Sequence, residues 1–240
     1  MNIKQLKEYV KNTYNVNCLL DRFGANTKLK KSSKGVYNVA GLSLMPSIKF
    51  CPMSVKAGCF DLCLKSAGRG RFNNVVNARN NKSNLYNNDY DLFMKLLVHE
   101  LNLHVINCRK NNVNPSARLN VLSDIPYENT CIFDLFKNIY FYDYTKRANR
   151  LEACNKIENY KLMFSYSGAS GYENQVIKAL QFDNPIAVVF KNVFPKMFLD
   201  RPVFDGDLSD IDNSTKHGHV IALKAKGSLA KNSLNDFVVA

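Results

Sequence analysis

Two patterns of apolar residues alternate along the chain, and together they predict a mixed α/β fold. Short runs rich in Val, Ile, Leu and aromatic residues are typical of buried strands. Longer stretches with apolar residues three and four positions apart are typical of helices. The expected strands lie at 36–45, 117–122, 139–144, 161–166, 186–190, 202–205 and 219–223. The expected helices lie at 3–20, 73–109, 127–136, 148–157 and 173–182.

The alternation of strands with helices predicts βαβ units, a mostly parallel sheet and right-handed crossovers. We therefore expect a partial or complete (β/α) barrel with mostly parallel strands and an appended N-terminal helix. In this division, residues 1–35 form the N-terminal helix and loop, and residues 36–240 form one barrel-like domain. Parallel strands share a carboxyl edge, where α/β folds place their ligand sites. Polar residues follow nearly every expected strand, so we expect the site at this edge.

The composition is typical of a globular protein. With 46% hydrophobic and 22% charged residues, it excludes collagen, coiled coils and wholesale disorder. No apolar run reaches the roughly 18 residues of a membrane span. The first residues carry lysines and lack the apolar stretch of a secretory signal. We therefore expect a cytoplasmic protein without a membrane partner. The sequence leaves its oligomeric state open.

The chain is strongly basic, which favours a polyanionic partner. It has 33 basic and 20 acidic residues, a net charge of +13. Basic side chains that neutralise phosphates release counterions, so we expect binding to nucleic acid or a nucleotide. A basic run could guide a phosphate backbone, with Phe72 available for base stacking, although a solvated start of a helix explains this run equally well. The basic run consists of Arg69, Arg71, Arg79 and Lys82.

Three of the seven cysteines form a cluster with the spacing C-x7-C-x3-C: Cys51, Cys59 and Cys63. An odd cysteine number in a cytosolic chain argues against a disulfide framework. Thiolates suit zinc or iron–sulfur iron. Structural zinc normally has four protein ligands, and this loop contains no fourth Cys or His. The three thiols better suit a four-iron four-sulfur cluster with one iron free, while zinc with a remote ligand, such as His217 or His219, and chance packing stay open.

A second candidate for chemistry is the acidic segment FDGDLSD, which contains Asp205, Asp207 and Asp210. Carboxylates at this spacing can ligate a hard cation or act as general acid and base. The first two share a side if the backbone is extended. A solvated acidic turn with Asx hydrogen bonds is the alternative.

The order of several motifs resembles the phage-encoded proteins catalogued as gene product 88 and, through them, the radical S-adenosylmethionine enzymes. The resemblance covers about residues 36–240, and it implies a location in the cytoplasm of an infected host cell if a phage encodes the chain. It rests on GLSLMP, then the three cysteines, then GRGRF, RLNVLSD, FYDYTKR, VFDGDLSD and ALKAKG. The cysteine spacing differs from the x3 and x2 of the radical enzymes, and their Gly-Gly-Glu turn is absent.

The resemblance implies a four-iron four-sulfur cluster on Cys51, Cys59 and Cys63 whose free iron binds S-adenosylmethionine. It implies that Leu122, Ser123 and Asp124 take the place of the Gly-Gly-Glu turn, with Asp124 accepting the ammonium of the cofactor. It also assigns contacts with the ribose and carboxylate of the cofactor to residues that follow the third and fourth strands. These residues are Tyr144, Thr145, Lys146, Ser165 and Ser167.

Three hypotheses follow. The leading one is an iron–sulfur protein, resembling radical S-adenosylmethionine enzymes, that acts on nucleic acid or a nucleotide. The second is a zinc-containing barrel transglycosylase that exchanges a base, with a nucleophile among Asp124, Asp205 and Asp207. The third is a non-catalytic module on a radical-enzyme scaffold that binds nucleic acid or a host factor, which the missing Gly-Gly-Glu turn favours.

Overall fold

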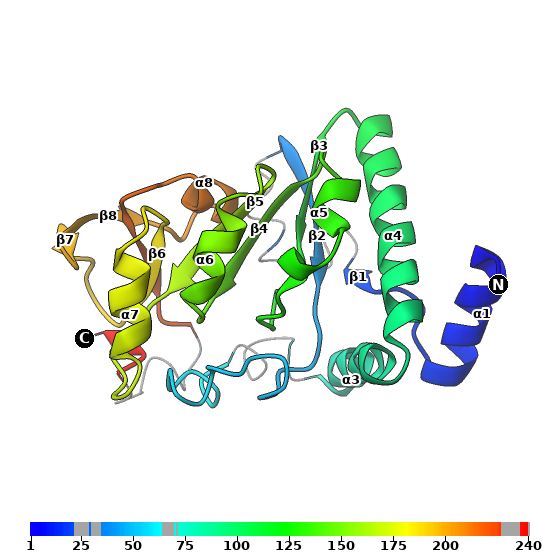
Figure 1. The fold of residues 1–240 in the computed structure, drawn as a ribbon, viewed down its shortest axis with the longest axis horizontal. Helices are drawn as coiled ribbons and strands as arrows, with labels where there is room; N and C mark the ends of the chain where they lie inside the picture. The colour runs from blue at the N-terminus through cyan, green and yellow to red at the C-terminus, as the bar shows by residue number, and fades with distance from the viewer. Residues whose placement is uncertain (22–28, 30–34, 64–69, 71, 227–235, 240) are drawn as a thin grey trace.

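The computed structural model describes residues 1–21, 29, 35–63, 70, 72–226 and 236–239 (Figure 1). Its helices are α1 (Ile3–Tyr14), α3 (Asn73–Asn88), α4 (Tyr90–Lys110), η3 (Tyr127–Asn129), α5 (Ile132–Leu135), α6 (Asn149–Cys154), α7 (Glu173–Leu180) and α8 (Asp210–Ser214). Its strands are β1 (Leu20–Asp21), β2 (Tyr37–Leu42), β3 (Asn114–Arg118), β4 (Tyr140–Thr145), β5 (Tyr160–Ser165), β6 (Ile186–Phe190), β7 (Met197–Phe198), β8 (Arg201–Asp205), β9 (Val220–Lys224) and β10 (Val238–Val239).

The strands form one mostly parallel sheet in the order β1-β2-β3-β4-β5-β6-β9-β8-β7. Strands β2 to β6, β9 and β8 run parallel, and only the short edge strands β1 and β7 pair antiparallel. Strand β10 adds in parallel to the carboxyl half of β6, with Val238 opposite Val189. The prediction of a mostly parallel sheet is confirmed. A closed barrel is not confirmed, because the described strands form an open sheet.

The connections between β2 and β6 place helices on one face of the sheet. These strands are neighbours in sequence order, so right-handed crossovers put each intervening helix on the same side. Figure 1 shows α4, α5, α6 and α7 along that face, and the two chain ends at opposite ends of the molecule. Helix α8 packs on the other face, where its Asp210 meets Arg118 of β3 and Tyr144 of β4.

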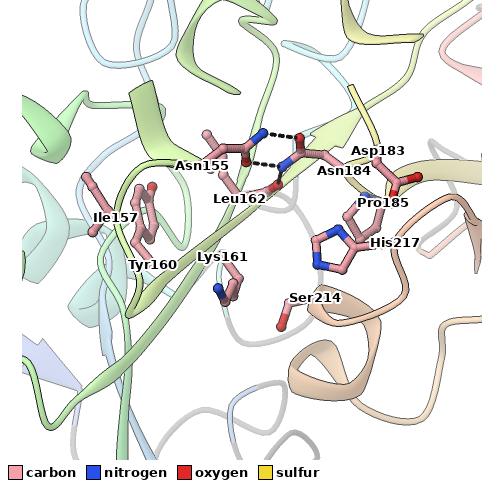
Figure 2. Close-up of a pocket in the computed structure, with 10 residues that line it drawn as sticks. All are labelled: Asn155, Ile157, Tyr160, Lys161, Leu162, Asp183, Asn184, Pro185, Ser214 and His217. Carbon is pink, nitrogen blue, oxygen red and sulfur yellow. Dashed lines mark hydrogen bonds between the residues drawn. The ribbon is translucent and has the colours of Figure 1, made fainter. Parts of the chain in front are cut away.

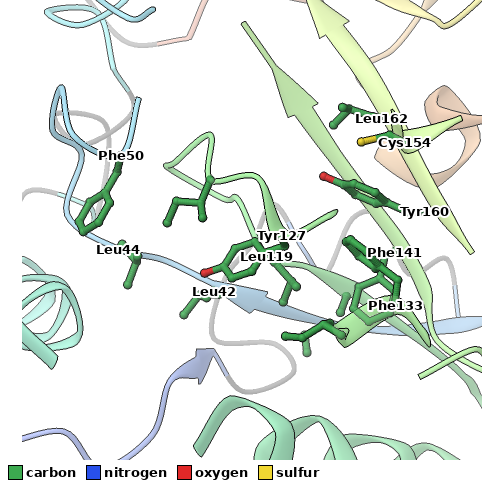
Figure 3. Close-up of a cluster of buried hydrophobic side chains, with 14 of the residues drawn as sticks. Leu42, Leu44, Phe50, Leu119, Tyr127, Phe133, Phe141, Cys154, Tyr160 and Leu162 are labelled. Carbon is green, nitrogen blue, oxygen red and sulfur yellow. The ribbon is translucent and has the colours of Figure 1, made fainter. Parts of the chain in front are cut away.

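Side-chain alternation along the strands sorts the core into two layers. On β4, Phe141 joins the main core under the helices, whereas Tyr142 joins a smaller cluster with Met163 and Ile211 on the opposite face. Aromatic rings fill the main core around Phe133, which stacks on Tyr160 with centroids 4.2 Å apart (Figure 3). These two layers fix the register of the strands and thus the positions of the loops at their carboxyl edge.

The N-terminal helix is confirmed, but it ends at Tyr14 instead of residue 20. Asn15 has φ 53° and ends the helix in the left-handed conformation, which Asn tolerates. Leu6 and Val10 belong to the same buried cluster as the sheet, and the helix packs against α3 and α4. The predicted boundary at residue 35 stays a prediction.

The long helix expected at 73–109 is two helices, broken at Asp89. The backbone of Asp89 leaves the helical region at φ −138° and ψ 62°, and its carboxylate accepts a hydrogen bond from the Tyr14 hydroxyl. A tertiary contact to α1 therefore accompanies a break that the apolar spacing does not indicate. None of the described helices is both long and apolar enough to span a membrane.

Candidate functional site

The cysteine loop, residues 47–63, follows β2 and folds as a series of tight turns. The carbonyl of Ser54 accepts hydrogen bonds from the amides of Cys59 and Phe60 and from the Cys59 thiol. The Ser54 hydroxyl donates to the carbonyl of Cys51, at 2.7 Å. Gly58 adopts φ 65°, a conformation that glycine adopts at no steric cost. Ser54 is therefore the residue that links Cys51 and Cys59 through hydrogen bonds.

The carboxyl ends of β3 and β5 anchor this loop to the sheet. The amide of Asp124 donates to the carbonyl of Phe50 at 2.7 Å, and the Ser167 hydroxyl donates to the carbonyl of Ala57 at 2.8 Å. Phe50 and Ala57 are buried in the main core. Two predicted site residues, Asp124 and Ser167, thus lie beside the loop, as the shared carboxyl edge predicts.

The three clustered cysteines are thiols outside any disulfide, and they share one electrostatic environment. Burial raises the pKa of Cys51, and the charges of Asp124, Cys59 and Cys63 raise it further. Burial also raises the pKa of Cys59, while Lys146 lowers it. Thiolates are the metal-binding form. At neutral pH these two thiols therefore stay protonated unless a further positive centre stabilises their thiolates.

The donor set suits a soft metal, but the described side chains are not arranged as a metal site. Within the described ranges, no group of three or more His, Cys, Asp or Glu side chains is placed to hold a metal ion. Ligation would require the sulfurs to move closer together. The assignment of Cys51, Cys59 and Cys63 as metal ligands therefore stays a prediction.

Lys146, at the end of β4, is a buried cation beside these thiols. Its ammonium donates to the carbonyls of Ser165 and Tyr166 at 3.1 and 3.0 Å and lies 4.2 Å from the centroid of the Phe237 ring. Burial lowers its pKa to about 8, against the opposing effect of Cys59, Asp124 and Cys51. A lysine with such a pKa can hold or release a proton near neutrality.

Asp124 is the node that joins the surrounding elements. It is 3% exposed. One carboxylate oxygen accepts from the Thr145 hydroxyl and from Arg150, and the other accepts from the amide of Lys146 at 3.0 Å. The protein itself thus uses both oxygens that were predicted to receive a cofactor ammonium. The predicted catalytic or cofactor-binding role of Asp124 is untested, and its observed role is to hold the ends of β3 and β4 together.

Arg150 of α6 carries the positive charge that balances Asp124. Its guanidinium forms a two-pronged pair with Glu128, at 2.7 Å for each bond, and also donates to the Tyr160 hydroxyl. Burial would lower its pKa, but Tyr160, Glu128 and Asp124 raise it, so it stays charged. Its paired carboxylates offset the cost of burying this charge.

A second buried charge set lies deeper in the sheet, around Asp143 of β4. Its carboxylate accepts from the amide of Asn120 at 2.9 Å and lies 3.7 Å from Nε of Arg118. Burial raises the pKa of Asp143 to about 7, although Arg118 and Asn120 lower it. Asn120 in turn accepts from the hydroxyl of Ser123 at 2.8 Å. Ser123, predicted to bind cofactor, thus stabilises the turn after β3.

The remaining predicted cofactor contacts divide between the two faces of the sheet. Tyr144 lies on the opposite face from the helices, where its hydroxyl donates to Asp210 at 2.8 Å. The backbone carbonyl of Ser165 joins the Lys146 group. The structure thus brings Lys146, Ser165 and Ser167 together with the cysteine loop, and directs the hydroxyl of Tyr144 toward α8.

The acidic segment forms a turn after β8, at the carboxyl end of that strand. Asp205 accepts from the amide of Asp207 at 3.0 Å, which is an Asx turn. Asp207 pairs with the ammonium of Lys226 at 2.9 Å. These contacts match the alternative of an acidic turn. The catalytic assignment of Asp205 and Asp207 is untested.

The predicted basic run is only partly described, because Arg69 and Arg71 lie outside the described residues. Arg79 is half-buried and donates to the carbonyl of Gly70 at 3.1 Å. Lys82 is 8% exposed, and its ammonium contacts the Leu19 carbonyl and Asp21. Lys82 therefore has partners within the protein, whereas its contact with nucleic acid stays a prediction.

Several residues that build the candidate site were not predicted from the sequence. Arg150, Glu128 and Asp143 form the buried charge sets, and Tyr172 and Phe237 lie beside the ammonium of Lys146. The signal for Asp143 was a carboxylate inside the aromatic run YFYDY, since a buried charge requires a partner. No sequence pattern indicates the approach of Phe237, which lies almost one hundred positions further along the chain.

The sequence model of the family described as gene product 88 matches residues 18–236. The chain therefore belongs to the gene product 88 family, as the resemblance indicated. Neither a curated protein nor a solved structure matches the chain. The likeness to radical S-adenosylmethionine enzymes gains no support from these comparisons.

We expect Arg150→Met to destabilise the protein by about 3–5 kcal/mol, because it leaves the buried carboxylates of Asp124 and Glu128 without their cation. Urea unfolding followed by circular dichroism measures this loss. The control is Arg109→Met, an exposed arginine in the last turn of α4, for which we expect a change below about 0.5 kcal/mol. Equal effects of the two substitutions would contradict the proposed role of Arg150.

The raised pKa of Asp143 predicts a pH-dependent stability difference between wild type and Asp143→Asn. Between about pH 4 and pH 7 the folded wild type holds a proton that the unfolded chain has lost. Its free energy of unfolding therefore falls as pH rises through this window, by up to about 4 kcal/mol. The variant lacks this contribution, so its stability relative to wild type should rise with pH.

Urea unfolding at several pH values between about 4 and 8 tests this expectation. The comparison uses the slope of the free energy of unfolding against pH, because a loss of stability that is the same at every pH does not change this slope. Asp134→Asn, at an exposed carboxylate of α5, is the matched control and should leave the slope unchanged. Parallel stability curves for wild type and Asp143→Asn would show that Asp143 is ionised throughout.

Proposed function

We propose that this member of the gene product 88 family binds an iron–sulfur cluster through Cys51, Cys59 and Cys63 and acts on a nucleic acid or nucleotide at the carboxyl edge of its sheet. The observation that carries the proposal is the shared environment of the thiols. They come from one loop and interact electrostatically with one another, and two of them, Cys51 and Cys59, lie near the buried ammonium of Lys146. When bound, such a cluster supplies one-electron chemistry and, with three thiolate ligands, one iron open to a small molecule.

The positive charges near the thiols support this proposal. Lys146 lowers the pKa of Cys51 and Cys59, and the half-buried Arg79 has a charge interaction with Cys63. Cations beside thiols favour the thiolate form. They also offset the negative charge that three thiolates bring to an inorganic centre. The residues of this chain thus supply both the ligands and part of their charge balance.

The position of the loop supports a reactive rather than a purely structural centre. The loop lies over the carboxyl ends of β3 and β5, held there by Asp124 and Ser167. This edge is where parallel α/β sheets present ligands. Cleavage of S-adenosylmethionine at this edge is the finer form of the proposal and rests on the motif resemblance alone.

The second candidate is a non-catalytic module that binds nucleic acid or a host factor. The observation that favours it is the internal engagement of Asp124, whose two carboxylate oxygens accept hydrogen bonds from the protein. The transglycosylase alternative would have zinc, in place of an iron–sulfur cluster, on the same cysteines. The identity of the bound metal therefore distinguishes this alternative from the iron–sulfur protein.

We expect wild-type protein purified without oxygen to be brown and to contain iron and acid-labile sulfide. Cys59→Ala should lose most of both, because it removes one of only three protein ligands. Metal and sulfide analysis, with the visible absorption spectrum, measures this. The control is Cys131→Ala, which removes an exposed cysteine remote in sequence from the loop and should keep the wild-type content.

The other outcomes distinguish the candidates. A colourless wild type that contains stoichiometric zinc, lost in Cys59→Ala, would replace the cluster by zinc. A wild type without bound metal under these conditions would refute the metal proposal and leave the binding module. Near-wild-type circular dichroism of Cys59→Ala confirms that the variant folds.

For the nucleic-acid partner, we expect binding of fluorescent single-stranded DNA that weakens steeply with salt, since the net charge is +13. Replacing Arg69 and Arg71 together by Gln should reduce the slope of log affinity against log salt by about 1.4, at about 0.7 for each lost phosphate contact. The control exchanges two exposed lysines of α1, Lys4→Gln with Lys7→Gln, for the same change in charge. Equal slopes for both double variants would contradict a specific role of the basic run.

A further inference from the structure

A cavity lies at the amino edge of the sheet, on the opposite side from the cysteine loop. Its volume is about 190 Å³. It is bounded by the start of β5, the turn before β6, the segment after α6, and the end of α8 with the turn that follows (Figure 2). The cysteine loop does not line it, and among the residues described around the candidate site it shares only Tyr160. It is therefore a separate feature, and its function does not depend on the proposed cluster.

Two basic side chains face this cavity. The ammonium of Lys161, on β5, points into it from one side, and the imidazole of His217 points into it from another (Figure 2). Within the described residues, Lys161 has no ion pair and the His217 ring accepts or donates no hydrogen bond. The only carboxylate among the lining residues belongs to Asp183. It lies beside the turn at Gly218, where it interacts with the positive charge of Arg201. The two donors thus leave the cavity suited to an anion.

The other polar groups of the cavity are already engaged and form a rigid wall. Asn155 and Asn184 exchange two amide hydrogen bonds of 2.9 Å, and Asn184 also donates to the carbonyl of Leu162. The Ser214 hydroxyl donates to the carbonyl of Ile211 and lies 2.7 Å from the Tyr140 hydroxyl. Because these groups are held by the protein, they fix the shape of the cavity and leave recognition of a charged ligand to Lys161 and His217.

Size and lining restrict the ligand further. Sites for drug-sized molecules enclose roughly 300–1,000 Å³, so this cavity suits a smaller molecule. Ile157, Leu162 and Pro185 contribute apolar surface. A lysine ammonium is a compact point charge that binds phosphate well. A phosphate group with a short carbon chain matches both the donors and the apolar wall.

We propose that this cavity binds a small phosphorylated metabolite, with its phosphate between Lys161 and His217. The site is distinct from the carboxyl edge and would bind its ligand whether or not the cysteines hold a metal. Its wall includes Tyr160, whose hydroxyl accepts from Arg150, the partner of Asp124. The ligand site therefore borders the hydrogen-bonded chain that ends at the cysteine loop.

Nuclear magnetic resonance titration of the full chain with glycerol 3-phosphate tests the proposal. We expect saturable shifts of the backbone amides of Leu162, Asn184 and His217. Lys161→Met should weaken the apparent affinity at least about tenfold, the loss expected for one hydrogen bond to a charged group. His217→Gln, an exposed position that leaves the core intact, should weaken it as well. Lys178→Met, at an exposed lysine of α7, is the matched control and should bind as wild type does.

Three results would overturn the proposal. The first is the absence of saturable shifts at these amides, and the second is unchanged affinity in both Lys161→Met and His217→Gln. The third is binding of succinate as tightly as glycerol 3-phosphate, which would show that the cavity does not select phosphate. Saturable binding of glycerol 3-phosphate that both variants weaken, and that succinate does not match, supports it.

Discussion

The buried carboxylate of Asp124 is the contact on which the carboxyl edge of this protein depends. Its oxygens accept hydrogen bonds from Thr145, the amide of Lys146 and Arg150, while its own amide holds Phe50 of the cysteine loop. One residue thus ties together the ends of β3 and β4, helix α6 and the loop. A carboxylate at 3% exposure is stable only with such partners. The positions of Thr145, the Lys146 backbone and the start of the cysteine loop follow from that requirement.

The same requirement explains why charges recur along one path through the sheet. Arg150 balances Asp124 and Glu128 and reaches the Tyr160 hydroxyl, which donates in turn to Asp143 at 3.4 Å. Arg118 lies 3.7 Å from Asp143 and pairs with Asp210 of α8 on the other face. Each buried ionisable group on this path has a group of opposite sign beside it, because burying a single unpaired charge would cost several kcal/mol of stability. The path therefore connects α8 to the cysteine loop without crossing solvent.

The sequence predicted the elements well where the signal was local. The β-branched runs predicted the long strands, and the common carboxyl edge correctly placed Asp124, Lys146 and Ser167 beside the cysteine loop. The misses involve contacts between residues distant in the chain. The break at Asp89 accompanies a hydrogen bond from Tyr14, and the short helix α8 is held by Arg118 and Tyr144. Neither contact leaves a periodic pattern in the sequence, so neither could be predicted from the spacing of apolar residues.

The candidate site and the cavity lie at opposite edges of one sheet, and their residues differ in burial and charge. At the carboxyl edge, burial lowers the pKa of Lys146 to about 8 and raises that of the thiols, so charge there depends on what binds. At the amino edge, the exposed imidazole of His217 and the half-buried ammonium of Lys161 stay in contact with solvent. Such donors bind an anion reversibly at small desolvation cost. The buried edge therefore suits a permanently held centre, and the open edge suits a ligand that exchanges.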